Sequence, residues 1–426
     1  MEIILLNTAT IFLIYKLANL TVGFPVSLWA ALLFATQPWA VFYSVLVYNP
    51  DVMAFLGCLF FLALWDVIQR PKSRSIFWAC LLLLIMPQFH MSGLMLVPAA
   101  AVVIVLAKAR LNFPWFITGL IAGGLAYVPY LRGEMAHRWH NTIGMFSGHE
   151  RHSWEGLKAL SAPLSFLVSW APRWTHSTHE YWELGKACFG SFVLFAAFSL
   201  LSAVVALCLI VGLFLKLKAT LSCTWRVPRD AFSRSPGVLF LSVMVAVPIF
   251  FALISRNPFH TRYCLVFLPG LLGLAGCAAQ TILSITRLEL PFATALIIST
   301  AANVWFMPAM YHYQRTRIEH GSTFVPSFRQ LETIYQELKK DAGQGQYIDV
   351  LVDRPYLRAL PAEDHLYREA ALIRPYTQVR ENESGTFPSA GRVVYKLCHG
   401  EKWDSVNGRI IYQARGVTIS RLERDE

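Results

Sequence analysis

The feature that most constrains this chain is a series of long apolar segments over its first 310 residues. About ten of them approach the roughly 17–25 residues that an α-helix needs to cross a bilayer. They are Ile3–Leu20, Pro25–Leu46, Val52–Ile68, Ser75–Pro87, Met91–Ala107, Phe113–Tyr130, Lys186–Leu215, Gly237–Ile254, Tyr263–Ile285 and Pro291–Met310. Only 15% of the residues are charged, whereas soluble proteins carry about 25%. The sequence therefore predicts an α-helical polytopic membrane protein with about ten transmembrane helices.

Lysine and arginine collect in short segments that an even number of predicted helices separates. These segments are Gln69–Ser75, Lys108–Arg110 and Lys216–Arg234, so all three lie on the same face of the membrane. The positive-inside rule makes that face cytoplasmic. The net charge of +11 then reflects orientation and contact with anionic lipid, so the lipid bilayer is the expected partner and nucleic acid is not.

The opposite, outer face carries polar and aromatic groups and the C-terminal tail. The groups are Tyr48–Asp51, Gln88–His90, residues 131–185 and Arg256–Arg262. Met1 also falls on this face, whereas a membrane protein of this size usually starts in the cytoplasm. We therefore expect a further N-terminal span and an outer loop to precede this chain.

Residues 311–426 predict a small α/β domain on the outer face. Helical periodicity marks Pro326–Asp341 and Pro361–Leu372. Strands are predicted at Tyr347–Val352, Arg392–Leu397 and Arg409–Ala414, with the last continuing towards Leu422. The expected organisation is a transmembrane domain over residues 1–310 and an extracytoplasmic α/β domain over residues 311–426.

Asn49, Pro50 and Asp51 follow Tyr48 at an aromatic tip where two predicted helices meet. A carboxylate at the mouth of two membrane helices is costly unless it works or pairs with a cation. Asp51 could act as a general base, bind a divalent metal or form an ion pair. The alternative is a helix start, because proline suits the first turn and aspartate suits the N-terminal end of the helix dipole.

Gln88 and His90 stand where two apolar helices meet, with Ser92 and Gly93 behind them. Polar side chains at that depth need partners or a role, so both are candidate site residues. The alternative for His90 is a structural hydrogen bond to a neighbouring helix.

Cations are densest between Arg256 and Tyr263, just before a long apolar helix. Arg256, His260 and Arg262 in this segment form a candidate anion site, since arginine recognises phosphate through two parallel hydrogen bonds. The alternative is anchoring at the membrane edge, where arginine and tyrosine are common.

Histidines and tryptophans fill the outer loop of residues 131–185, and His137 and His140 have the His-x-x-His spacing of some zinc sites. No carboxylate or cysteine pattern accompanies them, so no metal is assigned. The eight cysteines show no paired spacing of a zinc site or a disulfide framework. Tryptophans in such a loop suit stacking on sugar rings or lying at the membrane interface.

Four motifs give the chain a resemblance to a known family. They are LLFATQPWAVFYSVLVYNPD, PQFHMSGLMLVPAA, YVPYLRGEMAHRWHNT and NPFHTRYCLVFLPGLLGLAG. With these motifs the chain resembles the bacterial membrane glycosyltransferases of the dolichyl-phosphate-mannose-protein mannosyltransferase type, in the GT-C superfamily. The resemblance covers roughly Met1 to Met310, and the tail looks like the family's variable extracytoplasmic domain.

The resemblance implies a hexosyl- or pentosyl-transferase of the bacterial inner membrane that serves the cell envelope. A polyprenyl-phosphate sugar would be the donor, and a glycan, lipid or protein on the outer face would be the acceptor. Asp51 matches the family's second-loop acid, which is usually an auxiliary and not the principal base, and with His90 it is the catalytic candidate. The expected donor-phosphate ligands are Arg256, His260, Arg262 and Tyr263. The expected substrate contacts are Tyr48, Asn49, Gln88, His137 and His140. No cofactor is assigned, and a divalent metal is one option.

In one respect this chain departs from the family. The family's main catalytic acid lies in the first outer loop, and this chain begins within the segment that corresponds to the second helix. The alternatives are a fragment of a longer protein or an inactive relative. A non-catalytic scaffold and a transporter of lipid-linked sugar are the competing functions. A transporter would predict repeated halves, and no inverted repeat is visible in the sequence.

Overall fold

The computed structural model describes residues 2–37, 40, 52–136, 139, 143, 166, 186, 189–222, 235–254, 261–285, 287–316, 337, 340, 348–352, 377–381, 393–399, 408–414 and 417–422. At some helix ends and in the strands apart from Ile410, the backbone alone is described. The chain divides into two compact units, the first formed by residues 1–171 and 196–305 and the second by residues 172–195 and 306–426.

The described part of the first unit is built from α-helices and two short 3-10 helices. The α-helices are α1 (Glu2–Thr21), α2 (Val26–Thr36), α4 (Met53–Gln69), α5 (Ser75–Phe89), α6 (Leu96–Leu106), α7 (Phe113–Leu125), α8 (Val128–Ala136), α12 (Phe192–Ser222), α14 (Pro236–Ile254), α15 (Leu268–Leu283) and α16 (Glu289–Thr316), of which α12 and α16 also reach into the second unit. The 3-10 helices are η2 (Met91–Met95) and η4 (Thr261–Val266).

The chain has the apolar helices of a membrane protein. Among the described residues, 4 helices are long and apolar enough to span a bilayer, and α7 with α8, bent by 47°, makes up to 5. Five shorter apolar helices (α2, α4, α5, α6 with η2, and α15) occupy the positions of the other predicted spans. The total of about ten transmembrane helices remains a prediction.

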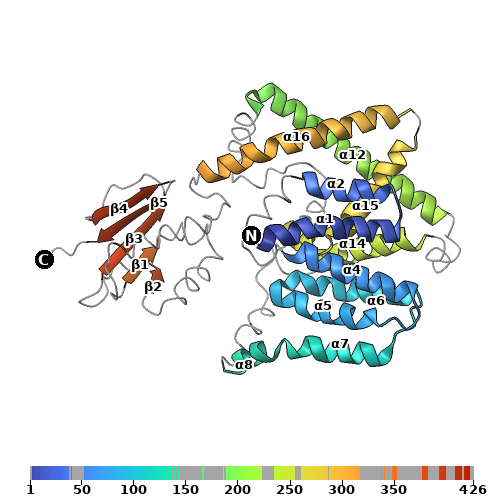
Figure 1. Cartoon of the computed structure of the whole chain (residues 1–426), viewed down its shortest axis with the longest axis horizontal. Coiled ribbons are helices and arrows are strands. Elements are labelled where there is room, and N and C mark those ends of the chain that lie inside the picture. The colour runs from blue at the N-terminus through green and yellow to red at the C-terminus, as the bar shows by residue number, and fades with distance from the viewer. Residues whose placement is uncertain are drawn as a thin grey trace. The chain divides into compact units, whose positions relative to one another are not determined.

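In the first unit, small residues let neighbouring helices pack closely. Helices α1, α4, α5 and α7 contact one another in that order, and α2 and α15 pack on α1 (Figure 1). A Cβ on Gly119 of α7 would lie 2.7 Å from the backbone oxygen of Phe77 of α5, so glycine permits this close approach. Helix α15 is buried over nearly its whole length, which places its glycine-, alanine- and leucine-rich sequence at the centre of the bundle.

Two basic turns of the first unit touch. The Lys72 backbone N–H donates to the Arg110 backbone oxygen at 2.8 Å, and the Asn112 side chain donates to the Lys72 backbone oxygen at 3.0 Å. The turn between α4 and α5 and the turn between α6 and α7 therefore lie side by side, which agrees with their predicted placement on one membrane face. We call this end of the unit the basic end.

Three predicted loop boundaries were wrong. Helix α8 runs to Ala136, so residues 131–136 of the expected outer loop are helical. Helix α12 runs to Ser222, so Lys216 and Lys218 lie within the helix and not in the loop assigned to Lys216–Arg234. Leu217, Ala219 and Leu221 continue the helix, and long lysine side chains can reach the membrane surface from its last turns. Thr261 and Arg262 likewise begin η4, within what was expected to be an outer loop.

The second unit contains a five-stranded mixed sheet with strand order β2-β1-β3-β5-β4. Its strands are β1 (Ile348–Val352), β2 (Thr377–Glu381), β3 (Val393–His399), β4 (Gly408–Ala414) and β5 (Val417–Leu422). Strand β1 is parallel to β2 and β3, whereas β5 is antiparallel to β3 and β4.

The sequence located β1, β3 and β4 to within one or two residues, but it missed β2. It also extended the last strand towards Leu422, where the structure has a separate strand, β5. Parallel neighbours require a crossover connection, usually helical. The helices predicted at Pro326–Asp341 and Pro361–Leu372 lie outside the described ranges, apart from single helical residues at 337 and 340, so the α/β domain remains a prediction.

Candidate functional site at the outer end of the helical unit

The end of the first unit opposite the basic end carries His90, the first turn of α4 and η4, and we call it the outer end. Helices α4 and α5 are joined at the basic end, so their other ends both point to the outer end. Helix η4 contacts α4 and η2 there. A Cβ on Gly57 of α4 would overlap the backbone oxygen of Val266 in η4, so glycine lets η4 sit directly on α4.

His90 forms a tight turn between α5 and η2. Its backbone is extended, with φ −158° and ψ 132°, and its Nδ1 accepts a hydrogen bond from the Ser92 backbone N–H at 3.2 Å. The Ser92 hydroxyl lies 2.9 Å from the same nitrogen. A Cβ on Gly93 would lie 2.8 Å from the Cβ of Met86, so this glycine lets the turn fold back onto α5.

These contacts assign the tautomer of the neutral His90 ring. Because Nδ1 accepts a backbone N–H, the ring proton belongs on Nε2. In that form Nε2 is a hydrogen-bond donor. Such a ring suits contact with a phosphate or sugar oxygen better than removal of a proton.

Tyr263 of η4 brings a second predicted cluster to this place. The rings of His90 and Tyr263 lie with their centroids 4.9 Å apart and are tilted by 53°. Arg262 precedes Tyr263 in the same 3-10 helix. The structure therefore joins the Gln88–His90 cluster with the C-terminal end of the Arg256–Tyr263 cluster.

Gln88 lies near the next helix pair. Its side chain is close to the hydroxyl of Tyr127, which lies between α7 and α8. That point is where the helix pair bends. Gln88, His90 and Tyr263 are thus the site candidates whose side chains the structure describes.

The remaining candidates are Tyr48, Asn49, Asp51, His137, His140, Arg256 and His260, which lie outside the described ranges, and Arg262, whose backbone alone is described. Among the side chains that the structure describes, no group of three or more His, Cys, Asp and Glu could hold a metal ion. The divalent-metal option rests on Asp51 and stays a prediction.

Three polar residues in apolar surroundings were missed as candidates. Glu134 of α8 is 1% exposed, Gln37 after α2 is 3% exposed and Asn7 of α1 is 8% exposed. The Gln37 Oε1 and Asn7 Nδ2 atoms are buried without a hydrogen-bond partner among the described residues. The signal was present in the sequence, because a polar residue inside an apolar run is a candidate site residue by default.

Comparison with known proteins gives the fold. No protein-family model matches the chain, and no curated protein matches it in sequence. The structure matches ArnT from Cupriavidus metallidurans, solved as a crystal structure bound to undecaprenyl phosphate. The TM-score is 0.53 at 11% identity, and the match covers 98% of this chain and 82% of ArnT. This likeness shows that the chain shares the fold of ArnT.

Proposed function

Starting from this fold, we propose that the protein transfers a sugar from a polyprenyl-phosphate donor to an acceptor on the outer face of the bacterial inner membrane. The observation that carries the proposal is the likeness to ArnT over nearly the whole chain. The contact between His90 and Tyr263 supports the location, because it unites two clusters that were each proposed for the substrate site.

On the donor side, Arg256, His260, Arg262 and Tyr263 hold the phosphate. Charge-assisted hydrogen bonds from arginine suit a phosphate that gains negative charge as the bond to the sugar breaks. His90 donates from Nε2 to an oxygen of the donor, which follows from the Ser92 N–H on Nδ1. Packing of Gly57 against Val266 holds the helix of Arg262 close to α4.

On the acceptor side, Asp51 is the general base. It directly precedes Val52, at the start of α4. The acceptor hydroxyl oxygen bonds to the anomeric carbon of the sugar, the bond from that carbon to the phosphate oxygen breaks, and the hydroxyl proton passes to the Asp51 carboxylate. Polyprenyl phosphate leaves. Tyr48, Asn49, Gln88, His137 and His140 contact the sugar or the acceptor.

Donor-phosphate binding is the first test. Undecaprenyl phosphate is titrated into the purified full chain in detergent, and its dissociation constant is measured. Arg262→Ala should raise this constant at least about tenfold, since one hydrogen bond to a charged group contributes about 1.5–3 kcal/mol. Arg110→Ala, which removes a cation from the basic end, is the matched control. An equal effect of both variants would refute the phosphate assignment.

Turnover separates the enzyme from the scaffold and the transporter. Membranes containing the full chain and their own acceptors receive a labelled polyprenyl-phosphate sugar, and release of polyprenyl phosphate is followed. The proposal requires release that Asp51→Asn reduces by about 100-fold or more, the lower range for general base catalysis. Binding without release would favour a transporter or a scaffold.

A further inference from the structure

The basic end of the helical unit contains a pocket that the proposed reaction does not use. It has a volume of about 690 Å³ and opens between α1, α4 and α5. Two cations, Lys16 of α1 and Arg70 at the end of α4, line it together with the Asp66 carboxylate. Volumes of about 300–1,000 Å³ are typical of small-molecule sites.

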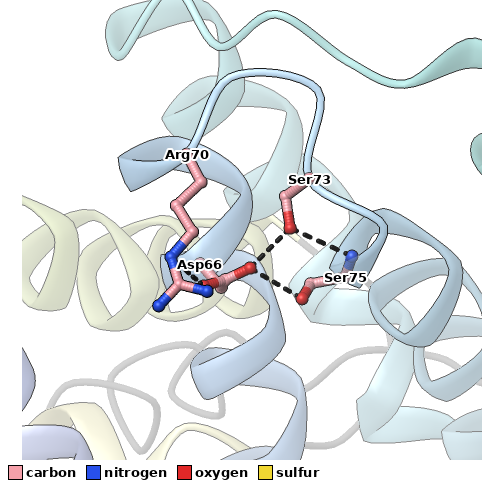
Figure 2. Close-up of polar contacts among 4 residues, drawn as sticks. All are labelled: Asp66, Arg70, Ser73 and Ser75. Atoms are coloured by element: carbon pink, nitrogen blue, oxygen red, sulfur yellow. Dashed lines mark hydrogen bonds and ion pairs between the residues drawn. The ribbon is translucent and has the colours of Figure 1, made fainter.

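Both oxygens of the Asp66 carboxylate contact neighbouring side chains. This carboxylate therefore repels a bound anion less than an unpaired carboxylate would. Its Oδ2 accepts hydrogen bonds from the Ser73 hydroxyl at 2.5 Å and the Ser75 hydroxyl at 2.7 Å. Its Oδ1 lies 3.2 Å from Nε of Arg70. Figure 2 shows the carboxylate between the arginine on one side and the two serines on the other.

The same contacts orient the arginine. Arg70 uses Nε for Asp66, and its two terminal nitrogens have no ion-pair partner in the described part of the chain. The Arg70 side chain is 78% exposed. No ion pair holds Lys16 among the described residues either. One carboxylate against two cations leaves the pocket with a positive charge, and the terminal guanidinium nitrogens can donate to one phosphate in parallel.

Below this charged rim the pocket wall is apolar and belongs to the membrane-embedded faces of two helices. Leu59 and Leu62 of α4 and Leu81 and Leu82 of α5 line it, with Trp78 beside them. Trp78 is 57% exposed, which is typical of tryptophan at the boundary between hydrocarbon and headgroups. A soluble anion would leave these leucines uncovered, whereas lipid acyl chains would cover them.

We propose that this pocket binds an anionic phospholipid of the leaflet at the basic end. The headgroup phosphate contacts Arg70 and Lys16, and the first part of an acyl chain lies along the leucines and Trp78. Basic pockets between membrane helices recognise anionic lipid in this way. By the positive-inside rule this is the cytoplasmic leaflet of the membrane. The bound lipid is therefore distinct from a donor that reacts at the outer end.

The test uses the purified full chain in nanodiscs of phosphatidylcholine that contain a small amount of phosphatidylglycerol with a photoreactive acyl chain. After illumination, crosslinked peptides are quantified by mass spectrometry. We expect labelling of the α4 and α5 peptides that contain the pocket leucines. Photoreactive phosphatidylcholine at the same level should label them several-fold less, because electrostatic attraction near the membrane contributes about fivefold per cation.

Charge variants give the decisive comparison. Lys16→Gln and Arg70→Gln should each lower labelling about fivefold, and the double variant about 25-fold. Arg70→Lys should retain most of it, which guards against loss of folding in the glutamine variants. Lys218→Gln, at the end of α12 and outside the pocket, is the matched control.

Three results would overturn the proposal. One is equal labelling by phosphatidylcholine and phosphatidylglycerol. Another is unchanged labelling in the double variant. The third is displacement of the lipid by glycerol 3-phosphate at a concentration similar to that of competing phosphatidylglycerol, because the pocket would then bind a free phosphate without using its apolar wall.

Discussion

The outer end and the basic end of the helical unit are both polar, but Asp66 at the basic end and His90 at the outer end have side-chain partners of different range. At the basic end, the partners of Asp66 come from the same α4–α5 connection, and the most distant of them is 9 positions away in the chain. At the outer end, the His90 ring lies against the Tyr263 ring of η4, which belongs to a distant part of the chain. The outer end therefore exists only when helices from separate parts of the chain have assembled.

This difference suggests a division of tasks. Short-range contacts use both carboxylate oxygens of Asp66 and fix the turn between α4 and α5. This turn is therefore stable whether or not a ligand is bound. The outer end instead gathers hydrogen-bonding groups from several elements. Gln37 and Asn7 add buried polar atoms that have no partner in the described part of the protein. Buried polar atoms without partners are costly and deserve a functional explanation.

The largest loss of stability should come from disrupting the contact between Gly57 of α4 and Val266 of η4. Gly57→Ala places a Cβ against the Val266 backbone oxygen, so η4 must move away from α4. We expect a loss of about 3 kcal/mol in the free energy of unfolding, at the upper end of overpacking costs. Thermal unfolding in detergent measures it. Gly124→Ala, where nothing lies within 4 Å of the added Cβ, is the control, and equal losses would show that η4 does not rest on α4.

Removing the hydrogen-bond acceptor Asp66 should destabilise the basic end. Asp66→Ala leaves the Ser73 and Ser75 hydroxyls and the Arg70 guanidinium without their shared partner, and we expect a loss of about 2 kcal/mol in the free energy of unfolding. Most of this comes from the hydroxyl contacts, because an exposed ion pair contributes about 0–1 kcal/mol.

Asp66→Asn is the matched variant, since its amide oxygen still accepts a hydrogen bond. It should lose less than about 1 kcal/mol. Equal losses in the two variants, measured by thermal unfolding under the same conditions, would mean that charge and not hydrogen bonding holds this turn.

The sequence predicted where the helices and basic turns lie better than it predicted the side-chain contacts at the two ends. Apolar runs and basic turns were sufficient to place the helices, because burial in lipid and charge asymmetry leave strong periodic signals. The contact between the α4–α5 and α6–α7 turns agrees with that reading. The sequence also named Gln88 and His90 as candidates from their chemistry, and the resemblance to the family added Tyr263.

The sequence could not predict which of the candidate residues contact one another. Nothing in the pattern joins His90 to Tyr263, because their contact depends on how η2 and η4 pack. The Ser92 contact that assigns the His90 tautomer is a matter of turn geometry, which hydrophobic periodicity does not encode. The contacts of Asp66 with Ser73 and Ser75 likewise depend on the geometry of the turn between α4 and α5.

The ring contact at the outer end should show as a coupling between two residues. A double-mutant cycle of His90→Ala and Tyr263→Ala should give a coupling energy of about 1 kcal/mol in the free energy of unfolding, within the range for aromatic pairs. A cycle of Tyr263→Ala with Phe77→Ala, a ring of α5 near the basic end, should be additive. Additivity in both cycles would contradict the contact between the two predicted clusters.

The smallest effect should come from a cation that stacks on a ring at the basic end. The Arg74 guanidinium carbon lies 5.6 Å from the centroid of the Trp115 ring, which joins the start of α5 to the start of α7. Arg74→Ala should cost about 0.5 kcal/mol in the free energy of unfolding, because the pair is exposed to solvent. Arg74→Lys keeps the charge and should lose less.

The effect is expected to be small because Gly119 and Phe77 already hold α5 against α7 through close packing. A loss above about 2 kcal/mol for Arg74→Ala, measured by the same unfolding assay, would exceed what a solvent-exposed cation over a ring supplies. It would show that the basic end is held more by this contact between two helices than by the short-range contacts of Asp66, and the contrast between the two ends would fail.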